Sequence, residues 1–336
     1  MADRPTVVLV MVPMLTAQLF DAELQARLCA VCRVPDSEPL ITFQESRAAA
    51  LLEIADVLLT GWGCPPIDQY VLARAPRLRA VVHAAGTVKA HVTDACWERG
   101  IAVTSAAAAN AVPVAEYTLA AILFANKKIF GVRNRYATAR AFRWWPAEFP
   151  GLGNYRKTVG IVGASRVGRR VIELLRPFDM TVLVSDPYLT STDAEALGVR
   201  SVALDDLLRA ADVVSLHAPA IPETRALLDR RRLALLRDGA TLINTARGWL
   251  VDGEALTAEL VSGRIDAVLD TTEPEVLPEG SPLYALPNVF LTPHVAGAMG
   301  AETQRMAALA IDEIERFARG EPFRHGIRRE ELARLA

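Results

Sequence analysis

The sequence of 336 residues is poor in cysteine, which leaves little material for a redox or metal motif. The four cysteines are Cys29, Cys32, Cys64 and Cys96. The first two form a C-x-x-C motif, which serves as a redox pair or half of a metal site in some proteins. Here the motif ends a helical pattern, DAELQARLCAVC, and the sequence has no second C-x-x-C. We therefore predict two small apolar residues on a helix and no metal site.

The sequence also lacks an excess of charge of one sign and a long apolar run. The net charge of −2 gives no reason to expect nucleic acid or a membrane surface as a partner. No apolar run reaches the roughly 18 residues that span a bilayer. The N-terminus, MADRPTVVLVMV, enters a strand pattern directly and lacks the layout of a signal peptide. We therefore expect a cytoplasmic protein.

What the sequence does contain is a regular alternation of short apolar runs with helical patterns. Its hydrophobic content of 51% and its length are enough for two well-packed domains. Apolar runs of three to seven residues, typical of buried parallel strands, occur at 6–12, 56–60, 78–83, 101–104, 181–184, 212–217, 240–244, 266–269 and 289–291. This alternation predicts an α/β fold with parallel sheets.

The stretch from Lys157 to Asp186 is organised as strand, glycine turn, helix, strand and terminal carboxylate. A dinucleotide site needs these parts in this order, because the helix N-terminus binds the pyrophosphate and the acid accepts from ribose hydroxyls. The turn reads GASRVG, so Ser165 replaces the middle glycine of G-x-G-x-x-G. An ordinary βαβ turn is the alternative interpretation.

Three polar side chains follow later strand patterns: Arg247 after ATLIN, Glu275 after AVLD and His294 after VFLT. A guanidinium can bind a carboxylate through several N–H groups, and an imidazole can donate or accept a proton. A carboxylate beside the imidazole would fix its tautomer and favour the imidazolium. Each residue alone could be structural or solvated. Their joint occurrence after a dinucleotide pattern favours hydride transfer to a 2-oxo acid.

The sequence closely resembles the D-isomer-specific 2-hydroxyacid dehydrogenase family over nearly its whole length. The stretches that carry the resemblance are NAVPVAEYTLA, TVGIVGASRVGRRV, DVVSLHAPAIPETRALL, INTARGWLVDGEAL and AVLDTTEPEVLPEGSPLYALPNVFLTPHVAG. The family implies hydride transfer between NAD(H) and a small 2-hydroxy acid/2-oxo acid pair, of the glyoxylate/hydroxypyruvate type or larger. It also implies that Arg247 binds substrate and that His294 and Glu275 form the acid/base pair.

The resemblance further implies the cofactor site and the domain plan. The charge of Asp186 favours NAD over NADP. We expect two Rossmann-like, doubly wound parallel-sheet domains, with the NAD-binding domain (110–297) inserted into a flavodoxin-like substrate domain (1–109 plus 298–336). Family members usually form homodimers through their cofactor domains. The implied cofactor-binding positions are Gly163, Ser165, Arg166, Val167, Gly168, Asp186, Ala218, Pro219, Thr224, Thr245, Ala246 and Asp270.

Two segments differ from the family pattern or cannot be placed by it. Family members usually carry a G-x-G loop that holds the substrate carboxylate, whereas this sequence has Gly86, Thr87 and Val88. We expect Val88 to narrow the approach to this loop, and we include Trp62 among the candidate substrate-binding residues. The aromatic segment 133–153 is expected to be irregular and to pack against a neighbour or a partner subunit. Because the substrate loop is altered, an NAD(H)-sensing corepressor is the alternative function.

Overall fold

The computed structural model describes residues 4–334, and it describes side chains as far as residue 332. The chain forms two compact units: unit 1 contains the described residues up to Asn110 and from Ala298 onward, and unit 2 contains Ala111–Gly297. Asn110, expected to open the cofactor domain, groups with unit 1, where its side-chain oxygen accepts a hydrogen bond from Ala298 N (2.9 Å). Residues 1–3 and 335–336 of the expected substrate domain lie outside the described residues.

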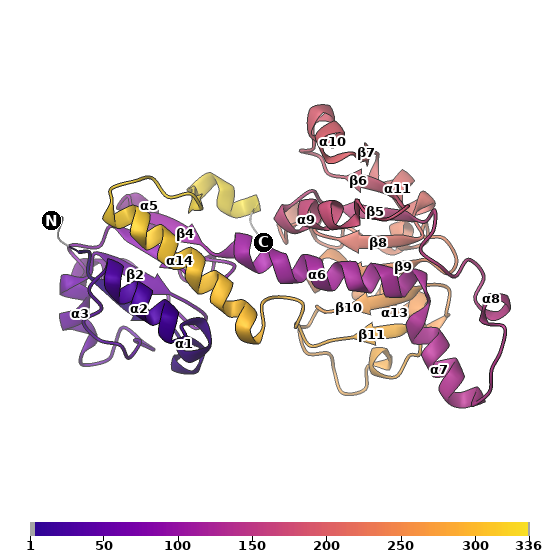
Figure 1. Cartoon of the computed structure of the whole chain (residues 1–336), viewed down its shortest axis with the longest axis horizontal. Helices are drawn as coiled ribbons and strands as arrows, with labels where there is room; N and C mark the ends of the chain where they lie inside the picture. The colour runs from indigo at the N-terminus through magenta and orange to yellow at the C-terminus, as the bar shows by residue number, and fades with distance from the viewer. Residues whose placement is uncertain (1–3, 335–336) are drawn as a thin grey trace. The chain divides into compact units, whose positions relative to one another are not determined.

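Unit 1 is built on a five-stranded sheet in the order β1-β2-β3-β4-β12 (Figure 1). The first four strands are parallel, and β12 runs antiparallel to β4. Bridges Thr6↔Arg33 and Val10↔Leu40 place segment 33–40 parallel along the other edge of β1, so the strand order reverses at β1. The strands are β1 (Val7–Val10), β2 (Val57–Thr60), β3 (Ala80–His83), β4 (Ala102–Ser105) and β12 (Gly326–Ile327).

Helices cover both faces of this sheet because the strands are buried on both sides. One face packs against α3, α4 and α5, and the other packs against α1, α2 and α14. In Figure 1, α14 lies beside α2, although the two are far apart in sequence. The helical elements of unit 1 are α1 (Pro13–Leu19), α2 (Ala22–Val31), α3 (Ala48–Ile54), α4 (Gln69–Arg74), α5 (Asp94–Glu98), η4 (Gly300–Glu302), α14 (Thr303–Ala318) and η5 (Arg329–Arg334).

Unit 2 is built on a seven-stranded, fully parallel sheet in the order β11-β10-β9-β8-β5-β6-β7. The strand order reverses between β5 and β8, which is where a doubly wound sheet binds its ligand. The α/β class and the doubly wound parallel sheets expected from the sequence are therefore confirmed. The strands are β5 (Thr158–Val162), β6 (Thr181–Ser185), β7 (Arg200–Ser201), β8 (Val213–Leu216), β9 (Thr241–Asn244), β10 (Asp266–Leu269) and β11 (Val289–Leu291).

The helices of unit 2 also form two layers. One layer includes α6 and α9, and the other includes α11, α12 and α13. The helical elements are α6 (Ala107–Asn126), α7 (Ile129–Ala139), α8 (Trp145–Glu148), α9 (Arg166–Leu175), α10 (Ser191–Leu197), α11 (Leu204–Ala210), η1 (Pro222–Thr224), α12 (Arg230–Leu233), η2 (Gly248–Leu250), α13 (Gly253–Val261) and η3 (Pro282–Tyr284).

Helix α6 begins in unit 1 and continues into unit 2. By length and mean hydropathy, α6 is the one helix in the described chain that could cross a membrane. Its sequence contains no unbroken apolar run of that length, so we did not expect such a helix. However, Ala115 and Ile122 are fully buried and pack in the core cluster that also contains residues of β5. A core helix of a globular domain passes the same test of length and composition.

The segment 133–153 is not irregular as expected. Its first residues continue α7 as far as Ala139, and α8 follows at Trp145. No residue of α7 is buried, so the helix has no buried apolar face to produce a helical period in the sequence. Exposed aromatic side chains, including Tyr136, Phe142 and Trp144, remain on this segment.

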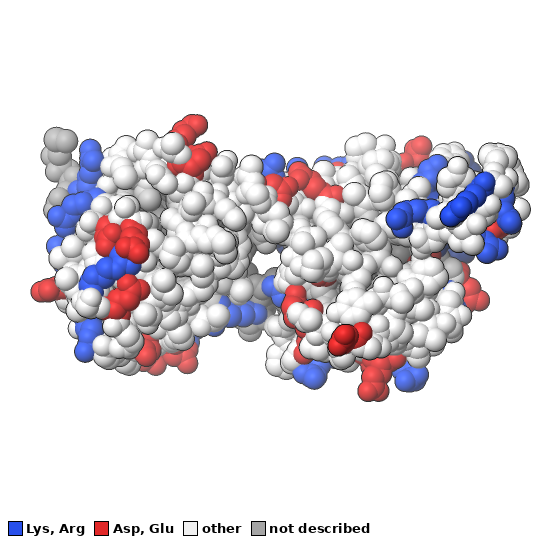
Figure 2. All heavy atoms as spheres, turned by 90° about the horizontal axis from the view of Figure 1, so that it is seen from below, with Lys and Arg blue, Asp and Glu red and all other residues white. Residues whose placement is uncertain are grey.

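Charged side chains of both signs are mixed on the face of the molecule shown in Figure 2, and much of that face is uncharged. No extended region of positive charge is visible there. The mixture agrees with the near-neutral composition of the sequence.

The close contact between β5 and α11 depends on Gly160. A Cβ atom built at this position would overlap the Leu207 side chain. We predict that Gly160→Ala lowers the free energy of unfolding by about 1–3 kcal/mol, because a buried methyl group must displace well-packed neighbours. Chemical denaturation followed by circular dichroism measures the change. Gly253→Ala is the matched control, since the nearest atom to its Cβ would lie 3.9 Å away; equal stability of both variants would contradict the prediction.

Candidate active site

The glycine turn after β5 brings the sheet and α9 close together. Gly163 has a φ of 98°, and a Cβ atom there would lie 2.7 Å from Ala218 N at the end of β8. At Gly168, a Cβ atom would overlap the carbonyl oxygen of Gly163. Both positions therefore require glycine, as a pyrophosphate-binding turn does.

Ser165 is the N-cap residue of α9, and its hydroxyl accepts a hydrogen bond from Gly168 N (3.3 Å). This arrangement gives a structural reason for serine at the position of the missing glycine. Arg166 N and Val167 N have no hydrogen-bond partner within residues 4–334. The first turn of α9 thus keeps N–H groups that fit a phosphate.

Asp186 follows β6 and is tied to the glycine turn. Its Oδ2 accepts a hydrogen bond from Ala164 N (2.7 Å), and its Oδ1 accepts one from Tyr188 N (2.7 Å). The carboxylate is therefore held beside the phosphate turn with lone pairs left for further donors. This is the position at which a dinucleotide fold binds ribose hydroxyls.

His217 lies behind the glycine turn and is fully buried within the sheet layer. Its Nε2 is 2.9 Å from Ser215 Oγ, and burial lowers the pKa of its imidazole to about 3. The ring is therefore neutral and supports the turn by packing, without adding positive charge behind the phosphate site.

Five further cofactor-binding candidates lie on the loops after β8 and β9, and two of them are threonines whose hydroxyls already have internal partners. Thr224 Oγ1 donates to Pro219 O (2.6 Å) and accepts from Ile221 N (3.1 Å). Thr245 Oγ1 is 3.0 Å from Thr118 Oγ1, which joins β9 to α6. These threonines shape their loops. The loops also carry Ala218 and Ala246.

Arg247, Glu275 and His294 lie on loops that follow β9, β10 and β11, which are adjacent strands of one sheet. Because the strands are parallel, all three loops leave the same edge. The turn at Arg247 is fixed by Asn244 Nδ2, which donates to Arg247 O (2.8 Å). A Cβ atom at the next residue, Gly248, would overlap the backbone of Thr272, so the first two loops are in close contact.

Glu275 and His294 form a direct pair, with Glu275 Oε1 2.6 Å from His294 Nδ1. Both side chains are about half exposed, at 56% and 44%. The carboxylate favours a proton on Nδ1 and leaves Nε2 for exchange with a ligand. Glu275, and not Glu273, is thus the acid that contacts the imidazole.

His294 has a left-handed backbone conformation, with a φ of 57°, which is uncommon for a residue other than glycine. The carboxylate of Asp270, which is 2% exposed, holds this conformation in place. Its Oδ1 accepts from Thr292 Oγ1 (2.6 Å) and Val295 N (2.8 Å), and its Oδ2 accepts from Ala296 N (2.9 Å). Asp270, a cofactor-binding candidate by sequence, therefore also fixes the histidine loop.

Tyr117 extends this network to α6. Its Oη is 2.8 Å from Thr292 Oγ1. Since the single hydroxyl proton of Thr292 is donated to Asp270, Tyr117 must be the donor in the second bond. Burial raises the pKa of Tyr117, so its proton is retained. Sequence reasoning missed Tyr117 and Thr292 as site residues, although both lie in stretches that carry the family resemblance.

The substrate-binding candidates of unit 1 need one correction. Val88 is 2% exposed and packs in the core of unit 1, so its side chain does not narrow the approach to the loop. Its φ is not positive, which means that valine replaces the expected glycine without backbone strain. Gly86 N, Thr87 N and Val88 N have no hydrogen-bond partner in the described part of the chain. Trp62 is 38% exposed.

Two neutral histidines lie under this loop. Thr60 Oγ1 is 2.9 Å from His83 Nδ1 and 3.3 Å from His91 Nε2. Burial lowers the pKa of His91 to about 4 and lowers the pKa of His83 well below its usual value. The loop therefore rests on an uncharged polar cluster.

The described residues contain no group of three or more His, Cys, Asp or Glu side chains that could hold a metal ion. Cys32 lies at the C-terminal end of α2, where its Sγ donates to Leu28 O (3.1 Å) and burial raises the pKa of its thiol to about 12.

A family model described as "D-isomer specific 2-hydroxyacid dehydrogenase, NAD binding domain" matches residues 119–296. The chain belongs to this family. It is 37% identical over 265 residues to a D-3-phosphoglycerate dehydrogenase of Mycobacterium bovis, covering 79% of this chain and 49% of that protein. It is 35% identical over 260 residues to a glyoxylate reductase of Korarchaeum cryptofilum, covering 76% of this chain and 78% of that protein.

A solved structure of a phosphoglycerate oxidoreductase from Rhizobium etli has a TM-score of 0.80 with this 2-hydroxyacid dehydrogenase family member. The two are 25% identical, and the match covers 97% of this chain and 99% of that one. The chain spans about half the length of the phosphoglycerate dehydrogenases it matches. These findings confirm the family and the NAD-binding fold. They give no support to a corepressor.

The histidine loop of this family member yields a test of the Asp270 network. We predict that Thr292→Val lowers the free energy of unfolding by about 1–3 kcal/mol, because a buried carboxylate loses a donor and Tyr117 loses its acceptor. Thr292→Ser, which keeps both bonds, should remain within about 1 kcal/mol of the unaltered chain. Urea denaturation measures both. If the two variants are equally stable, the hydroxyl does not contribute as argued.

Proposed function

We propose that this protein is an NAD-dependent D-2-hydroxyacid dehydrogenase that interconverts a small 2-oxo acid and its D-2-hydroxy acid. The observation that carries the proposal is the Glu275–His294 pair, with its 2.6 Å contact, on the sheet edge that also presents Arg247. The glycine turn, the free N–H groups of α9 and Asp186 together fit a dinucleotide. When bound, NAD(H) supplies the hydride chemistry.

His294 is proposed as the acid/base. In the reductive direction, Nε2 donates a proton to the substrate oxygen, while Glu275 stabilises the imidazolium through Nδ1. In the oxidative direction, Nε2 accepts the proton from the hydroxyl group. Asp270 fixes the loop backbone next to His294, and Glu275 orients the imidazole through Nδ1.

Arg247 and the loop of Gly86, Thr87 and Val88 are proposed to bind the substrate. The guanidinium offers several N–H donors to carboxylate or carbonyl oxygens. The unpaired N–H groups of the loop suit a carboxylate in the same way, and the buried Val88 side chain leaves the outer side of the loop open.

Asp186 is proposed to select NAD(H) over NADP(H). Its carboxylate is fixed at the end of β6 by Ala164 N and Tyr188 N, so it cannot readily turn away. A 2′-phosphate placed against it would meet negative charge, and the residues that follow, Pro187 to Thr192, include no arginine or lysine.

His294→Ala should lower kcat for 2-oxo acid reduction by roughly 10²- to 10⁴-fold, because the proton donor is lost. The His294→Ala variant should still bind NADH, which fluorescence titration measures. The unaltered chain should oxidise NADH faster than it oxidises NADPH.

Glu275→Gln should also lose activity. Glu273→Gln, two residues away, is the matched control and should keep its activity. Retention of most activity in His294→Ala would remove His294 from the mechanism; faster oxidation of NADPH would overturn the cofactor assignment.

We further propose that the protein forms a homodimer through the surface around α7 and α8. Phe142 and Trp144 are 86% and 71% exposed there, and exposed aromatic clusters of this kind mark protein interfaces. Light scattering should give about twice the chain mass of 36.4 kDa. Replacing Phe142 and Trp144 together by Glu should shift the mass toward a monomer, whereas Val276→Glu, an exposed position outside this segment, should not. A monomeric unaltered chain would refute the proposal.

A further inference from the structure

The residue Trp249 joins two loops of unit 2 that leave the same edge of the sheet. Strands β8 and β9 are parallel neighbours, so the loops that follow them begin side by side. We call residues 217–228 the β8 loop and residues 245–251 the Arg247 turn, and Trp249 lies in the Arg247 turn. The β8 loop carries three of the cofactor-binding candidates, Ala218, Pro219 and Thr224.

Trp249 holds the β8 loop through three different groups. Its indole Nε1 donates to Ile221 O (3.0 Å). Its carbonyl oxygen accepts from Ala226 N (2.9 Å). The face of its ring contacts the guanidinium of Arg225, whose Cζ is 4.2 Å from the ring centre. One residue of the Arg247 turn thus contacts the β8 loop at three positions between residues 221 and 226.

Bonds inside the β8 loop shape its turn at η1. Thr224 N donates to Ile221 O (3.0 Å), and Thr224 Oγ1 donates to Pro219 O (2.6 Å). Ile221 O therefore accepts one hydrogen bond from inside the loop and one from the indole, for which a carbonyl oxygen has lone pairs. The turn that presents Thr224 is thus connected to the Arg247 turn through the indole.

The end of the β8 loop also depends on Trp249. Ala226 has a left-handed backbone, with a φ of 46°, which is unfavourable for alanine and is held by the bond to Trp249 O. Beyond it the two segments pair through their backbones, because Leu228 N donates to Leu250 O (3.0 Å) and Asp252 N donates to Leu228 O (3.0 Å). The loop is thus anchored by β8 at one end and by this pairing at the other, and the Trp249 side chain acts between the two anchors.

The Arg247 turn is a firm support for the indole. Leu250 is fully buried, and the Trp249 side chain packs against the same core cluster. On the other side, Gly248 lies directly against the backbone of Thr272. Because Trp249 is held from both sides along the chain, the β8 loop takes the position that the indole sets.

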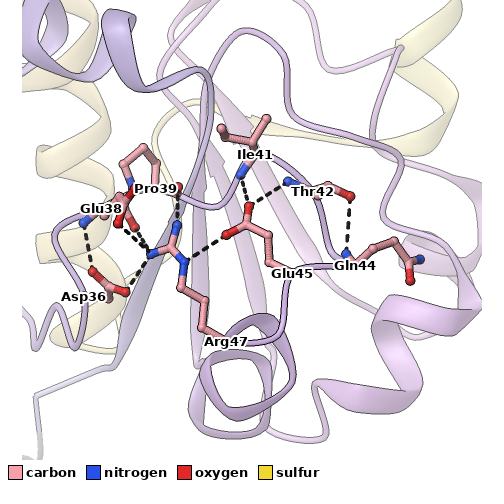
Figure 3. A network of polar contacts seen from close by, with 8 residues as sticks. All are labelled: Asp36, Glu38, Pro39, Ile41, Thr42, Gln44, Glu45 and Arg47. Carbon is pink, nitrogen blue, oxygen red and sulfur yellow. Dashed lines mark hydrogen bonds and ion pairs between the residues drawn. The ribbon is translucent and has the colours of Figure 1, made fainter.

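The arginine cluster of Figure 3 shows how this arrangement differs from a closed structural network. In unit 1, Arg47 donates to the carboxylates of Asp36 (2.6 Å) and Glu45 (2.8 Å). It also donates to two carbonyl oxygens of the segment between them. These bonds stay inside residues 36–47 and fix that segment alone. Arg225 instead contacts a ring that belongs to a different loop, so its contact joins separate parts of the site.

We propose that Trp249 is a positioning residue for the dinucleotide, whose indole fixes the β8 loop in the conformation that binds NAD(H). Trp249 acts through Ile221 and Arg225 and not by contact with the cofactor. Because it belongs to the Arg247 turn, the loop for the cofactor and the arginine proposed to bind substrate keep a fixed separation. The inference rests on the cofactor assignment of the proposed function and not on which acid is reduced.

Fluorescence titration of the full chain with NADH tests the proposal. Trp249→Leu removes the N–H group and the ring but keeps an apolar side chain, and it should raise the Kd for NADH by roughly tenfold. Trp249→Phe keeps a ring and loses the N–H group, and it should raise the Kd by about threefold. Trp97→Phe is the matched control, because Trp97 is a partly buried tryptophan of unit 1, and its Kd should not change.

Limited proteolysis without cofactor gives a measurement that does not depend on activity. Trypsin cleaves after arginine, and the guanidinium of Arg225 lies on the indole. In Trp249→Leu, cleavage after Arg225 should be several-fold faster than in the unaltered chain, because the loop opens more often. Cleavage after Arg143, an exposed arginine next to α8, should keep its rate. Mass spectrometry identifies the fragment that begins at Ala226.

Arg225→Ala separates an action through the ring from direct contact with the cofactor. If Arg225 acts through Trp249, this change should raise the Kd for NADH by about two- to threefold in the unaltered chain and leave the Kd of Trp249→Leu unchanged. Equal factors in both backgrounds would show that Arg225 acts without Trp249 and would overturn this step of the proposal.

Further measurements separate a positioning role from a merely structural one. Thermal midpoints show which variants are folded at the assay temperature. The pH dependence of kcat should be the same in Trp249→Phe as in the unaltered chain, because the Glu275–His294 pair lies on other loops; a shifted profile would place the effect at that pair and overturn the proposal.

The outcomes also separate this inference from the proposed function. An unchanged Kd for NADH in the folded variants of Trp249, or the same rise in Trp97→Phe, would overturn the positioning role. The expected changes in Kd and cleavage in a chain that reduces no 2-oxo acid would refute the proposed function and leave the role of Trp249 standing.

Discussion

The buried carboxylate of Asp270 is the group on which the geometry of the candidate active site depends. It accepts hydrogen bonds from one hydroxyl and two backbone N–H groups of the loop that carries His294. These bonds stabilise the backbone of His294 at a φ of 57°, which is unfavourable for a residue other than glycine. Without these donors, burial of this carboxylate, which is 2% exposed, would be unfavourable in free energy. Loop and carboxylate therefore stabilise each other, and the contact of His294 with Glu275 follows from that mutual support.

Much of unit 2 could be predicted because its constraints are local in sequence. Gly163 and Gly168 are required by a turn of a few residues, and Asp186 lies one helix and one strand beyond them. Strand ends could be found from short apolar runs, so Arg247, Glu275 and His294 could be placed on one edge. That Glu275 rather than Glu273 meets the imidazole needed the family resemblance, since both acids lie in the same exposed loop.

Other features could not be read from sequence, for physical reasons. Tyr117 and Thr292 are 175 residues apart, and nothing in either local pattern indicates that they meet. Val88 lies in a loop, where alternation does not tell which side chain faces the core. Because its side chain is buried, the expected narrowing of the approach to the substrate loop is absent. Helix α7 has no buried face, so a pattern based on burial could not reveal it.

The two units differ in how freely their site residues can vary. In unit 2, Gly248 packs against the backbone of Thr272, and Asp270 is enclosed by its donors, so most replacements there would disturb the loops themselves. In unit 1, backbone bonds and the Glu45–Arg47 pair fix the loops, while Met14, Ile41 and Trp62 project outward with large exposed fractions. Those side chains are not among the buried residues of the unit 1 core. A fold built in this way can keep the loops of its acid/base pair fixed while outward-facing residues of other loops vary.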